Sequence, residues 1–194
     1  MLMPVSENIY NKSLFVSGEI PDEEAFVYDT CSSPAGDIVF CSDGRGLARL
    51  WFAGRNPRYD ALAACGRKEA NEYNESTRRW LEIYFSGREP DFMPCLSLYG
   101  SAFRTKIWEM LLDIPFGGLV TYGELARAYA VAKGMTRMSS RAVGQAVGSN
   151  PVSIIVPCHR VVGSGNRLTG YGGGMDKKQA LLLVEGIDTS GFRL

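Results

Sequence analysis

One short stretch constrains this chain more than any other, because it ends an apolar run at a proline and places two reactive side chains directly after it. The run Ile154-Ile155-Val156 is β-branched and is followed by Pro157. Proline fixes its own φ and lacks an N–H, so it closes an extended segment. The pattern predicts that the apolar run closes at Pro157 and that Cys158 projects from a strand end or from a turn.

Cys158 is followed by His159, the only histidine of the chain. A thiol becomes a strong nucleophile as the thiolate, and an imidazole relay with cationic neighbours favours that form. Adjacent side chains point about 180° apart on a strand and about 100° apart on a helix, so we expect the two groups to communicate through a water. An isolated Cys-His pair is more often a buried structural cysteine beside a half-exposed histidine. The flanking sequence therefore has to decide between a nucleophile and a structural residue.

The cysteines argue against two classes of site. They stand at 31, 41, 65, 95 and 158, an odd number without Cys-x-x-Cys spacing, so neither a disulfide framework nor a zinc site is expected. A single histidine argues against a histidine-rich metal centre. The sequence has no apolar stretch long enough to span a bilayer, and residues 1–20 lack a basic region followed by an apolar run. These features predict a cytoplasmic protein that holds no metal.

Charge is divided unevenly between the two halves of the chain. The net charge is zero, but residues 1–100 carry 10 lysines and arginines against 15 aspartates and glutamates, whereas residues 101–194 carry 11 against 6. The second half is therefore positive by five charges and could meet phosphates. Charge spread over solvated faces explains the imbalance equally well.

The first half of the 194 residues predicts a small α/β domain over 1–97. Residues 42–46 are glycine-rich and separate two short apolar runs, a pattern typical of a β-hairpin. Aromatic and aliphatic residues recur at helical spacing over 75–86 and are core candidates. We expect a small antiparallel sheet with strands over 25–30, 36–41 and 47–52, a short helix over 60–65, a longer helix over 75–86 and a proline-bearing linker over 89–94.

The second half, 98–194, predicts a mainly helical domain. Thr121 and Glu124 form a capping box at the start of one helix, and Ser139 or Ser140 caps the next, over 141–147. Two short helices joined by a turn, the second built from Ala, Val and Gly, resemble a helix-turn-helix, whose small side chains let a backbone approach a nucleic-acid groove. Two packed core helices are the commoner explanation of such a pair. Further helices are expected over 101–112 and, capped by Asp176, over 177–184.

Three other features of this half bear on a site. Arg141 is the only large cation of the helix over 141–147. The glycine triplet after Tyr171 suits a loop that closes on a flat ligand, because its backbone N–H groups are unobstructed. Glu185 stands at a helix C-terminus, where the macrodipole opposes a carboxylate. An orienting contact with His159 would explain that position, and an exposed charge is the alternative.

Together these segments resemble the O6-alkylguanine-DNA alkyltransferase family over roughly residues 100–186. The string Pro157-Cys158-His159-Arg160-Val161-Val162 is the most specific part of the match. The other matching strings, in the same order as in the family, are Ile114-Pro115-Phe116-Gly117, Thr121-Tyr122-Gly123-Glu124, Ser140-Arg141-Ala142-Val143-Gly144, Gly148-Ser149-Asn150-Pro151, Gly170-Tyr171-Gly172-Gly173 and Glu185-Gly186. The resemblance implies a ribonuclease-H-like α/β domain followed by a mainly α, winged helix-turn-helix-like domain.

The resemblance also implies a reaction. Cys158 accepts the alkyl group from O6-alkylguanine, and O4-alkylthymine is a second candidate lesion. His159 acts as a base through a water, and Glu185 orients the imidazole. Tyr122 hydrogen-bonds a guanine ring nitrogen, and Asn150 ties its helix to the active-site segment. Each molecule acts once, as a monomer and without a cofactor, because the product is a thioether.

Double-stranded DNA is the partner that the resemblance implies. The target nucleotide must leave the duplex, and Arg141 fills the vacated stack. The face of the same helix that carries Ala142 and Gly144 lies in the minor groove. The residues implied to hold the flipped base or the DNA are Arg160, Val161, Tyr171 and Gly172.

The chain departs from the family pattern in three places. Arg104 stands where a glutamine is common, Gly172 stands where some members have serine, and the turn over 131–138 is longer than in the shortest members. Two other functions share parts of this pattern. The first is a DNA-lesion binder that transfers no alkyl group, but such proteins carry tryptophan in place of Cys158. The second is a cysteine hydrolase, which would turn over repeatedly.

Overall fold

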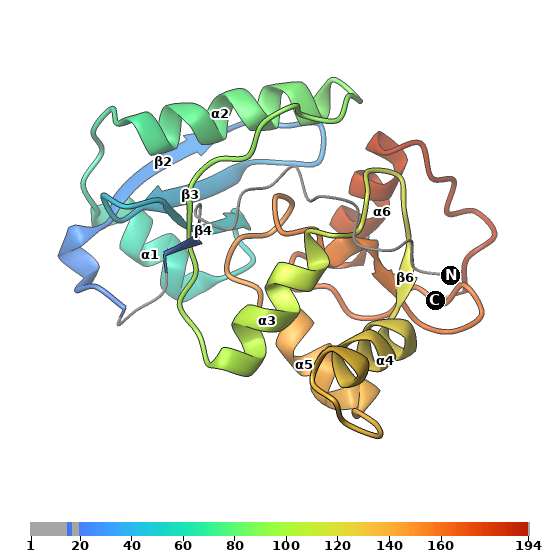
Figure 1. Cartoon of the computed structure of the whole chain (residues 1–194). Coiled ribbons are helices and arrows are strands. Elements are labelled where there is room, and N and C mark those ends of the chain that lie inside the picture. Colours follow the sequence, from blue (N-terminus) through green and yellow to red (C-terminus); the bar gives the residue numbers. More distant parts are fainter. Residues whose placement is uncertain (1–14, 17–19, 194) are drawn as a thin grey trace.

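The computed structural model describes residues 15–16 and 20–193, and Figure 1 shows a sheet with helices on both sides joined to a helical half. The sheet has the order β1-β5-β4-β3-β2. Its strands are β1 (Phe15–Val16), β2 (Val27–Cys31), β3 (Ile38–Ser42), β4 (Leu47–Phe52) and β5 (Leu96–Ser97). The strands β2, β3 and β4 are antiparallel, as expected, but β5 joins β4 in parallel and β1 joins β5 in parallel. The predicted antiparallel sheet is therefore a mixed one.

Both faces of this sheet are covered, which explains why every residue of β3 is buried. On one face, Phe40 and Leu50 pack against Trp80 and Tyr84 of α2 (Glu72–Phe85). On the other face, alternate residues of the same strands form a second cluster with Ala63 of α1 (Pro57–Cys65). Figure 1 shows these two helices on opposite sides of the strands. The hairpin over 36–52 and the helix expected over 75–86 are thus present, the helix starting three residues earlier.

Two of the predicted boundaries in this half were wrong. The short helix expected over 60–65 begins earlier, at Pro57, because the Asn56 side chain accepts a hydrogen bond from the Tyr59 N–H and Pro57 occupies the first helical turn of α1. The strand expected over 25–30 begins instead at Val27, after a 3-10 turn, η2 (Glu23–Ala25).

The second half is helical, as expected. Its elements are α3 (Ala102–Leu111), β6 (Val120–Thr121), α4 (Tyr122–Ala132), α5 (Ser140–Gly148), a 3-10 turn η3 (Cys158–Arg160), β7 (Val161–Val162) and α6 (Met175–Val184). The capping box of Thr121 and Glu124 opens α4, and Ser139 caps α5. The indole N–H of Trp108 donates to the carbonyl of Ala146 at 2.8 Å and so ties α3 to α5.

Of the two alternatives left open for the segment before Cys158, a strand end or a turn, the structure has a tight turn. Ile154 has φ +71°, a left-handed conformation that is rare for a β-branched residue, and the Ile155 N–H donates to the Ser153 carbonyl at 2.8 Å. The extended residues lie just before the turn instead. Leu50 of β4 donates its N–H to Pro151 and accepts from the Ser153 N–H, so Val152 pairs with the edge of β4.

The last helix also begins earlier than expected. Gly174, with φ +93°, is the N-cap of α6, and Asp176 lies in the first helical turn without capping it. The positive φ of Gly174 is a conformation that side-chain-bearing residues rarely adopt, so this φ favours glycine at the position.

The two halves share one apolar core. The cluster that contains Phe40, Leu50 and Tyr84 of the sheet half also contains Trp108 and Val156 of the helical half. A domain boundary between residues 97 and 98 stays a prediction, since the core is continuous across it.

Candidate active site

Cys158 begins the 3-10 turn η3, at the floor of a cavity and with 7% of its surface exposed. The Asn150 side chain holds the segment that carries it. The Asn150 Nδ2 donates to the Val156 carbonyl at 2.8 Å and to the Cys158 Sγ at 3.0 Å, while its Oδ1 accepts from the Val152 N–H at 3.0 Å. One amide thus closes the loop over 150–158 and contacts the sulfur.

The thiol is the resting form of Cys158. Burial raises the pKa of the thiol, and the hydrogen bond from Asn150 and the charge of Lys178 lower it by less. Cationic neighbours were expected to favour the thiolate. The structure supplies one such cation, but its effect is smaller than that of burial, so the sulfur needs a base when it reacts.

His159 is fully buried and is held on one side only. Its Nε2 lies 2.7 Å from the Glu185 Oε1, whereas its Nδ1 has no hydrogen-bond partner within the described part of the chain. Burial lowers the pKa of the imidazole, and the opposing effect of Glu185 is smaller, so the ring is neutral at neutral pH. A carboxylate can only accept, which places the single proton on Nε2 and leaves the lone pair of Nδ1 free.

Glu185 is the C-cap of α6 and is 5% exposed. Its Oε1 accepts from the Tyr84 hydroxyl at 2.8 Å and its Oε2 accepts from the Gly117 N–H at 3.0 Å, in addition to the contacts of His159 and Arg160. Burial alone would raise the pKa of this carboxyl, but His159 and Arg160 outweigh it and lower the pKa to about 2. These donors explain a carboxylate at a helix end that the macrodipole does not favour.

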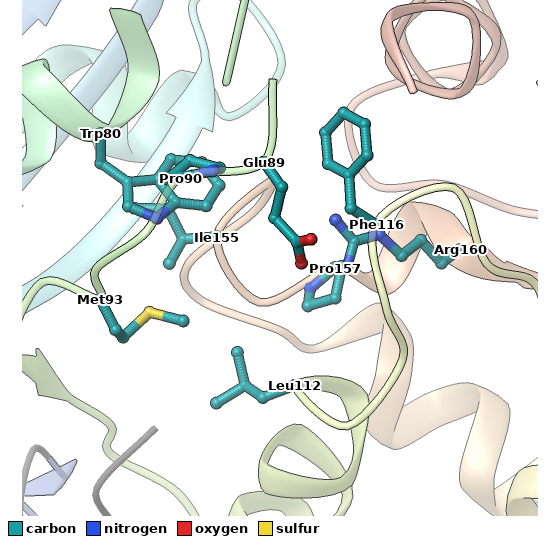
Figure 2. A pocket seen from close by; sticks show the side chains of 9 residues that line it. All are labelled: Trp80, Glu89, Pro90, Met93, Leu112, Phe116, Ile155, Pro157 and Arg160. Carbon is teal, nitrogen blue, oxygen red and sulfur yellow. The ribbon is translucent and has the colours of Figure 1, made fainter. Parts of the chain in front are cut away.

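Arg160 does not lie where the sequence analysis placed it. It is 8% exposed, and its Nε and Nη2 donate to both oxygens of Glu185 while its Nη1 donates to the Ile114 carbonyl. Figure 2 shows it beside Phe116 and Pro157. These residues line a crevice of about 10 Å³, which has room for one water. We therefore correct its assignment to the DNA contacts: the guanidinium holds Glu185.

Above Cys158 lies a cavity of about 680 Å³, within the range of small-molecule sites. It is enclosed by the start of α4, by α5 and by the loops over 163–172. Seven of the twelve predicted site residues line it, namely Tyr122, Arg141, Gly144, Asn150, Cys158, Tyr171 and Gly172. His159, Glu185 and Arg160 form the buried layer beneath.

Two predicted contact residues do not line this cavity. Ala142 is half-buried at the start of α5, where its N–H donates to the capping Ser139 side chain. Val161 is fully buried, and its carbonyl accepts from the Lys178 Nζ at 2.6 Å. That carbonyl is consequently engaged within the protein.

The sequence analysis missed several residues that build the site. Lys178 is fully buried in α6 and donates to the Thr169 carbonyl at 3.0 Å as well as to the Val161 carbonyl. It thereby joins β7 to the loop that contains Thr169. Tyr84 was identified only as a core residue. Helical spacing gives the burial of such side chains but not the partners of their polar ends, although a lysine inside the leucine-rich run over 177–184 is a readable signal.

The described part of the chain, 15–16 and 20–193, has no group of three or more His, Cys, Asp or Glu residues that could hold a metal ion. None of the helices within it is long and apolar enough to cross a membrane.

Comparison with known protein families gives a match to the helical half. Residues 102–187 match the model described as 6-O-methylguanine DNA methyltransferase, DNA binding domain. This range includes α3, the whole cavity floor and Glu185.

Curated relatives extend the likeness over most of the chain. A methylated-DNA–protein-cysteine methyltransferase of Methanosarcina acetivorans is 38% identical, over 82% of this chain and 97% of the relative. A protein of the same name from Haemophilus influenzae is 38% identical, over 84% of this chain and 88% of the relative.

Solved structures agree with these relatives. The crystal structure of Mycobacterium tuberculosis OGT in complex with DNA has a TM-score of 0.69 and 36% identity, over 81% of this chain and 91% of that one. The O6-methylguanine-DNA methyltransferase of Pyrococcus kodakaraensis has a TM-score of 0.60 and 25% identity, over 84% and 99%.

Proposed function

The chain belongs to the family of methylated-DNA–protein-cysteine methyltransferases, and from that membership we propose that Cys158 is the cysteine that accepts the methyl group. The protein repairs methylated DNA by direct transfer of a methyl group to one of its own cysteines. One observation selects the residue. Of the five cysteines, Cys158 alone lines the 680 Å³ cavity, and it directly precedes His159 in the sequence.

The first step is removal of the thiol proton. His159 Nδ1 has a free lone pair and takes the proton of Cys158 through a bridging water, while Glu185 stabilises the imidazolium that forms. Base and carboxylate thus work as a triad with a water inserted. The salt bridge to Arg160 keeps Glu185 ionised, so that the proton stops on the imidazole.

The second step is displacement at a saturated carbon. The Cys158 sulfur forms a bond to the alkyl carbon as the bond from that carbon to guanine O6 breaks, and the electron pair passes into the purine. The Tyr122 hydroxyl lines the cavity and donates to a ring nitrogen, which relieves the negative charge. The proton lost by the thiol ends on the released guanine, so the products are unmodified guanine and a thioether.

The chain needs no cofactor for this reaction and acts once, because water and cellular thiols do not displace a thioether. We infer O6-alkylguanine as the substrate, with O4-alkylthymine as a second candidate. The protein acts as a monomer in the cytoplasm. The sheet half has a ribonuclease-H-like arrangement, and the helical half has that of a winged helix-turn-helix.

DNA binding is assigned to α5, which follows α4 as the second helix of the pair seen in Figure 1. Arg141 is exposed at its start and also lines the cavity, so the side chain can enter a duplex where the damaged nucleotide has swung out. Ala142 and Gly144 keep this face of α5 small enough to lie in the minor groove.

Intact-mass analysis tests the assignment of Cys158. After incubation with an oligonucleotide that carries O6-methylguanine, the protein is expected to gain one methylene equivalent, about 14 Da, as thiolate alkylation requires. The gain should disappear in Cys158→Ala and persist in Cys65→Ala, which removes an exposed cysteine. Tight binding without a mass change would indicate a lesion binder, and repeated turnover would indicate a hydrolase.

A further inference from the structure

Tyr84 places a hydroxyl from the sheet half of the chain directly on the buried pair of His159 and Glu185. It lies in α2, 75 residues before His159, and is fully buried. The hydroxyl donates to the Glu185 Oε1 at 2.8 Å, and its oxygen lies 3.3 Å from the His159 Nε2. The same carboxylate oxygen therefore accepts hydrogen bonds from both the imidazole and the phenol.

Aromatic packing fixes the phenol ring in this position. Trp80 stacks on it with centroids 5.3 Å apart, and Phe85 and Phe116 meet it edge-on at 5.1 and 5.8 Å. The ring is held on three sides, and its hydroxyl oxygen lies 2.8 Å from the Glu185 Oε1 and 3.4 Å from the Leu181 carbonyl, so Glu185 is the nearer acceptor of a preorganised donor.

We propose that Tyr84 is a positioning residue of the methyl transfer: its hydroxyl holds the Glu185 carboxylate against His159 Nε2, so that Nδ1 stays free and directed at Cys158. This inference rests on the proposed function of Cys158. It gives the sheet half a direct part in the chemistry, beyond its share of the core.

The geometry explains why one more donor matters. Glu185 has four partners, Tyr84 on α2, Gly117 on a loop, and His159 and Arg160 on η3, and each of them limits where the carboxylate can sit. Arg160 donates to both oxygens and Gly117 donates to Oε2, so these donors orient the carboxylate as a whole. Tyr84 donates to Oε1, the oxygen that also accepts the hydrogen bond of the imidazole, and thereby helps to fix that contact.

The hydroxyl also lowers the proton affinity of the Glu185 carboxylate. A donor to an ionised oxygen reduces its attraction for a proton, so Tyr84 limits how strongly Glu185 favours the imidazolium in the resting protein. Removal of the donor should make the imidazole easier to protonate. The ionisable groups near this hydroxyl are Glu185 and Lys178 from α6 and its end, His159 and Arg160 from η3, and Tyr171 from the loop.

The test is Tyr84→Phe, which keeps the ring and removes the hydroxyl. Tyr28→Phe is the matched control, because Tyr28 is also buried in the sheet half but packs in the second cluster. Since the chain has one histidine, labelling with ¹⁵N-histidine gives a single imidazole in the NMR spectrum. The tautomer and the protonation midpoint of His159 can then be read in the resting protein, without substrate.

In Tyr84→Phe we expect the imidazole midpoint to move to higher pH, and the single-turnover rate to fall about tenfold at pH 7, as for loss of a hydrogen bond to a charged group. The rate should fall equally on free O6-methylguanine base and on duplex DNA, and affinity for the duplex should not change. Tyr28→Phe should match the wild type in each measurement.

An unchanged rate, or a slower rate with unchanged imidazole resonances, would overturn the proposal and leave Tyr84 a structural residue. Should Tyr84→Phe fail to fold, 3-fluorotyrosine at position 84 keeps the hydroxyl and makes it a stronger donor. The imidazole midpoint should then move to lower pH, and no movement would refute the proposal. The NMR measurement stands even where wild-type protein transfers no methyl group, which separates failure of this inference from failure of the proposed function.

Discussion

Replacement of Glu185 by glutamine should remove a large, pH-dependent part of the stability of the folded chain. The carboxylate is 5% exposed and neutralises Arg160, which is 8% exposed. In Glu185→Gln the guanidinium stays buried without a counter-charge. Breaking a buried pair in this way costs about 3–5 kcal/mol at pH 7.

The lowered pKa of Glu185 gives an independent value for the stability that its ionisation contributes. The pKa falls from its ordinary value of 4.5 to about 2 in the folded chain. Because one pKa unit corresponds to about 1.4 kcal/mol, this ionisation stabilises the folded chain by about 3 kcal/mol. A carboxyl whose folded pKa is depressed contributes this stability fully above pH 4.5 and loses it as the pH falls toward 2. At pH 3, about 2 kcal/mol of the contribution should be gone.

The assay is urea unfolding of wild type and Glu185→Gln at pH 7 and at pH 3. The difference between their free energies of unfolding should shrink by about 2 kcal/mol at the lower pH, since the wild-type carboxyl then approaches the neutral amide of the variant. Glu82→Gln serves as control, because Glu82 is an exposed residue of α2. Its difference from wild type should stay within about 0.5 kcal/mol at both pH values.

A difference that is the same at pH 3 and pH 7 would refute this reasoning. It would mean that Arg160 and His159 do not keep Glu185 ionised. The proposed step in which His159 keeps the proton taken from Cys158 would then be wrong. Comparison of the two proteins cancels the titration of groups that do not contact Glu185, and His159, which this carboxylate holds, is the one titrating group that stays in the difference.

Two other changes probe the DNA contact and the buried lysine. Arg141→Ala should slow repair of O6-methylguanine in duplex DNA while leaving reaction with the free base nearly unchanged, in single-turnover assays; equal losses on both substrates would remove Arg141 from base flipping. Lys178→Met should destabilise the chain by about 2 kcal/mol at pH 7, because the Val161 and Thr169 carbonyls lose their donor. Burial lowers the pKa of Lys178 from 10.5 to about 8, so the folded chain releases this proton first and stability relative to Lys178→Met should rise between pH 8 and 10.5. Urea unfolding measures the difference between the free energies of unfolding of the two proteins. A constant difference from pH 8 to 10.5 would contradict the conclusion that burial of the charge lowers the pKa of Lys178.

Local sequence signals predicted the elements that local chemistry specifies. The capping box of Thr121 and Glu124, the hairpin turn over 42–46 and the helix containing Trp80 are each determined by residues that are close in sequence. The two-residue strands β1 and β5 carry no such signal, because β5 is defined by its pairing with β4 and β1 by its pairing with β5.

What the sequence left open or misplaced near Cys158 has a common physical cause. The β-branched run over 154–156 favours a strand by propensity, but hydrogen bonds from Leu50 fix the preceding residues and force Ile154 into a turn. Arg160 follows Cys158 and His159 in sequence, yet the 3-10 turn directs it to Glu185 on the far side. Tyr84 reads as a core residue because periodicity reports burial, whereas its function lies in the single polar atom at its tip.

The pairing of Leu50 with Val152 also bears on how this protein folds. These residues are about a hundred positions apart, so the turn that holds Ile154 and Cys158 is fixed by a contact between distant parts of the chain. The hydrogen bonds of Glu185, which holds the imidazole beside Cys158 in sequence, likewise come from α2, from a loop and from η3. The reactive site is therefore a property of the whole folded chain, and no short segment of it would hold the sulfur and its base together.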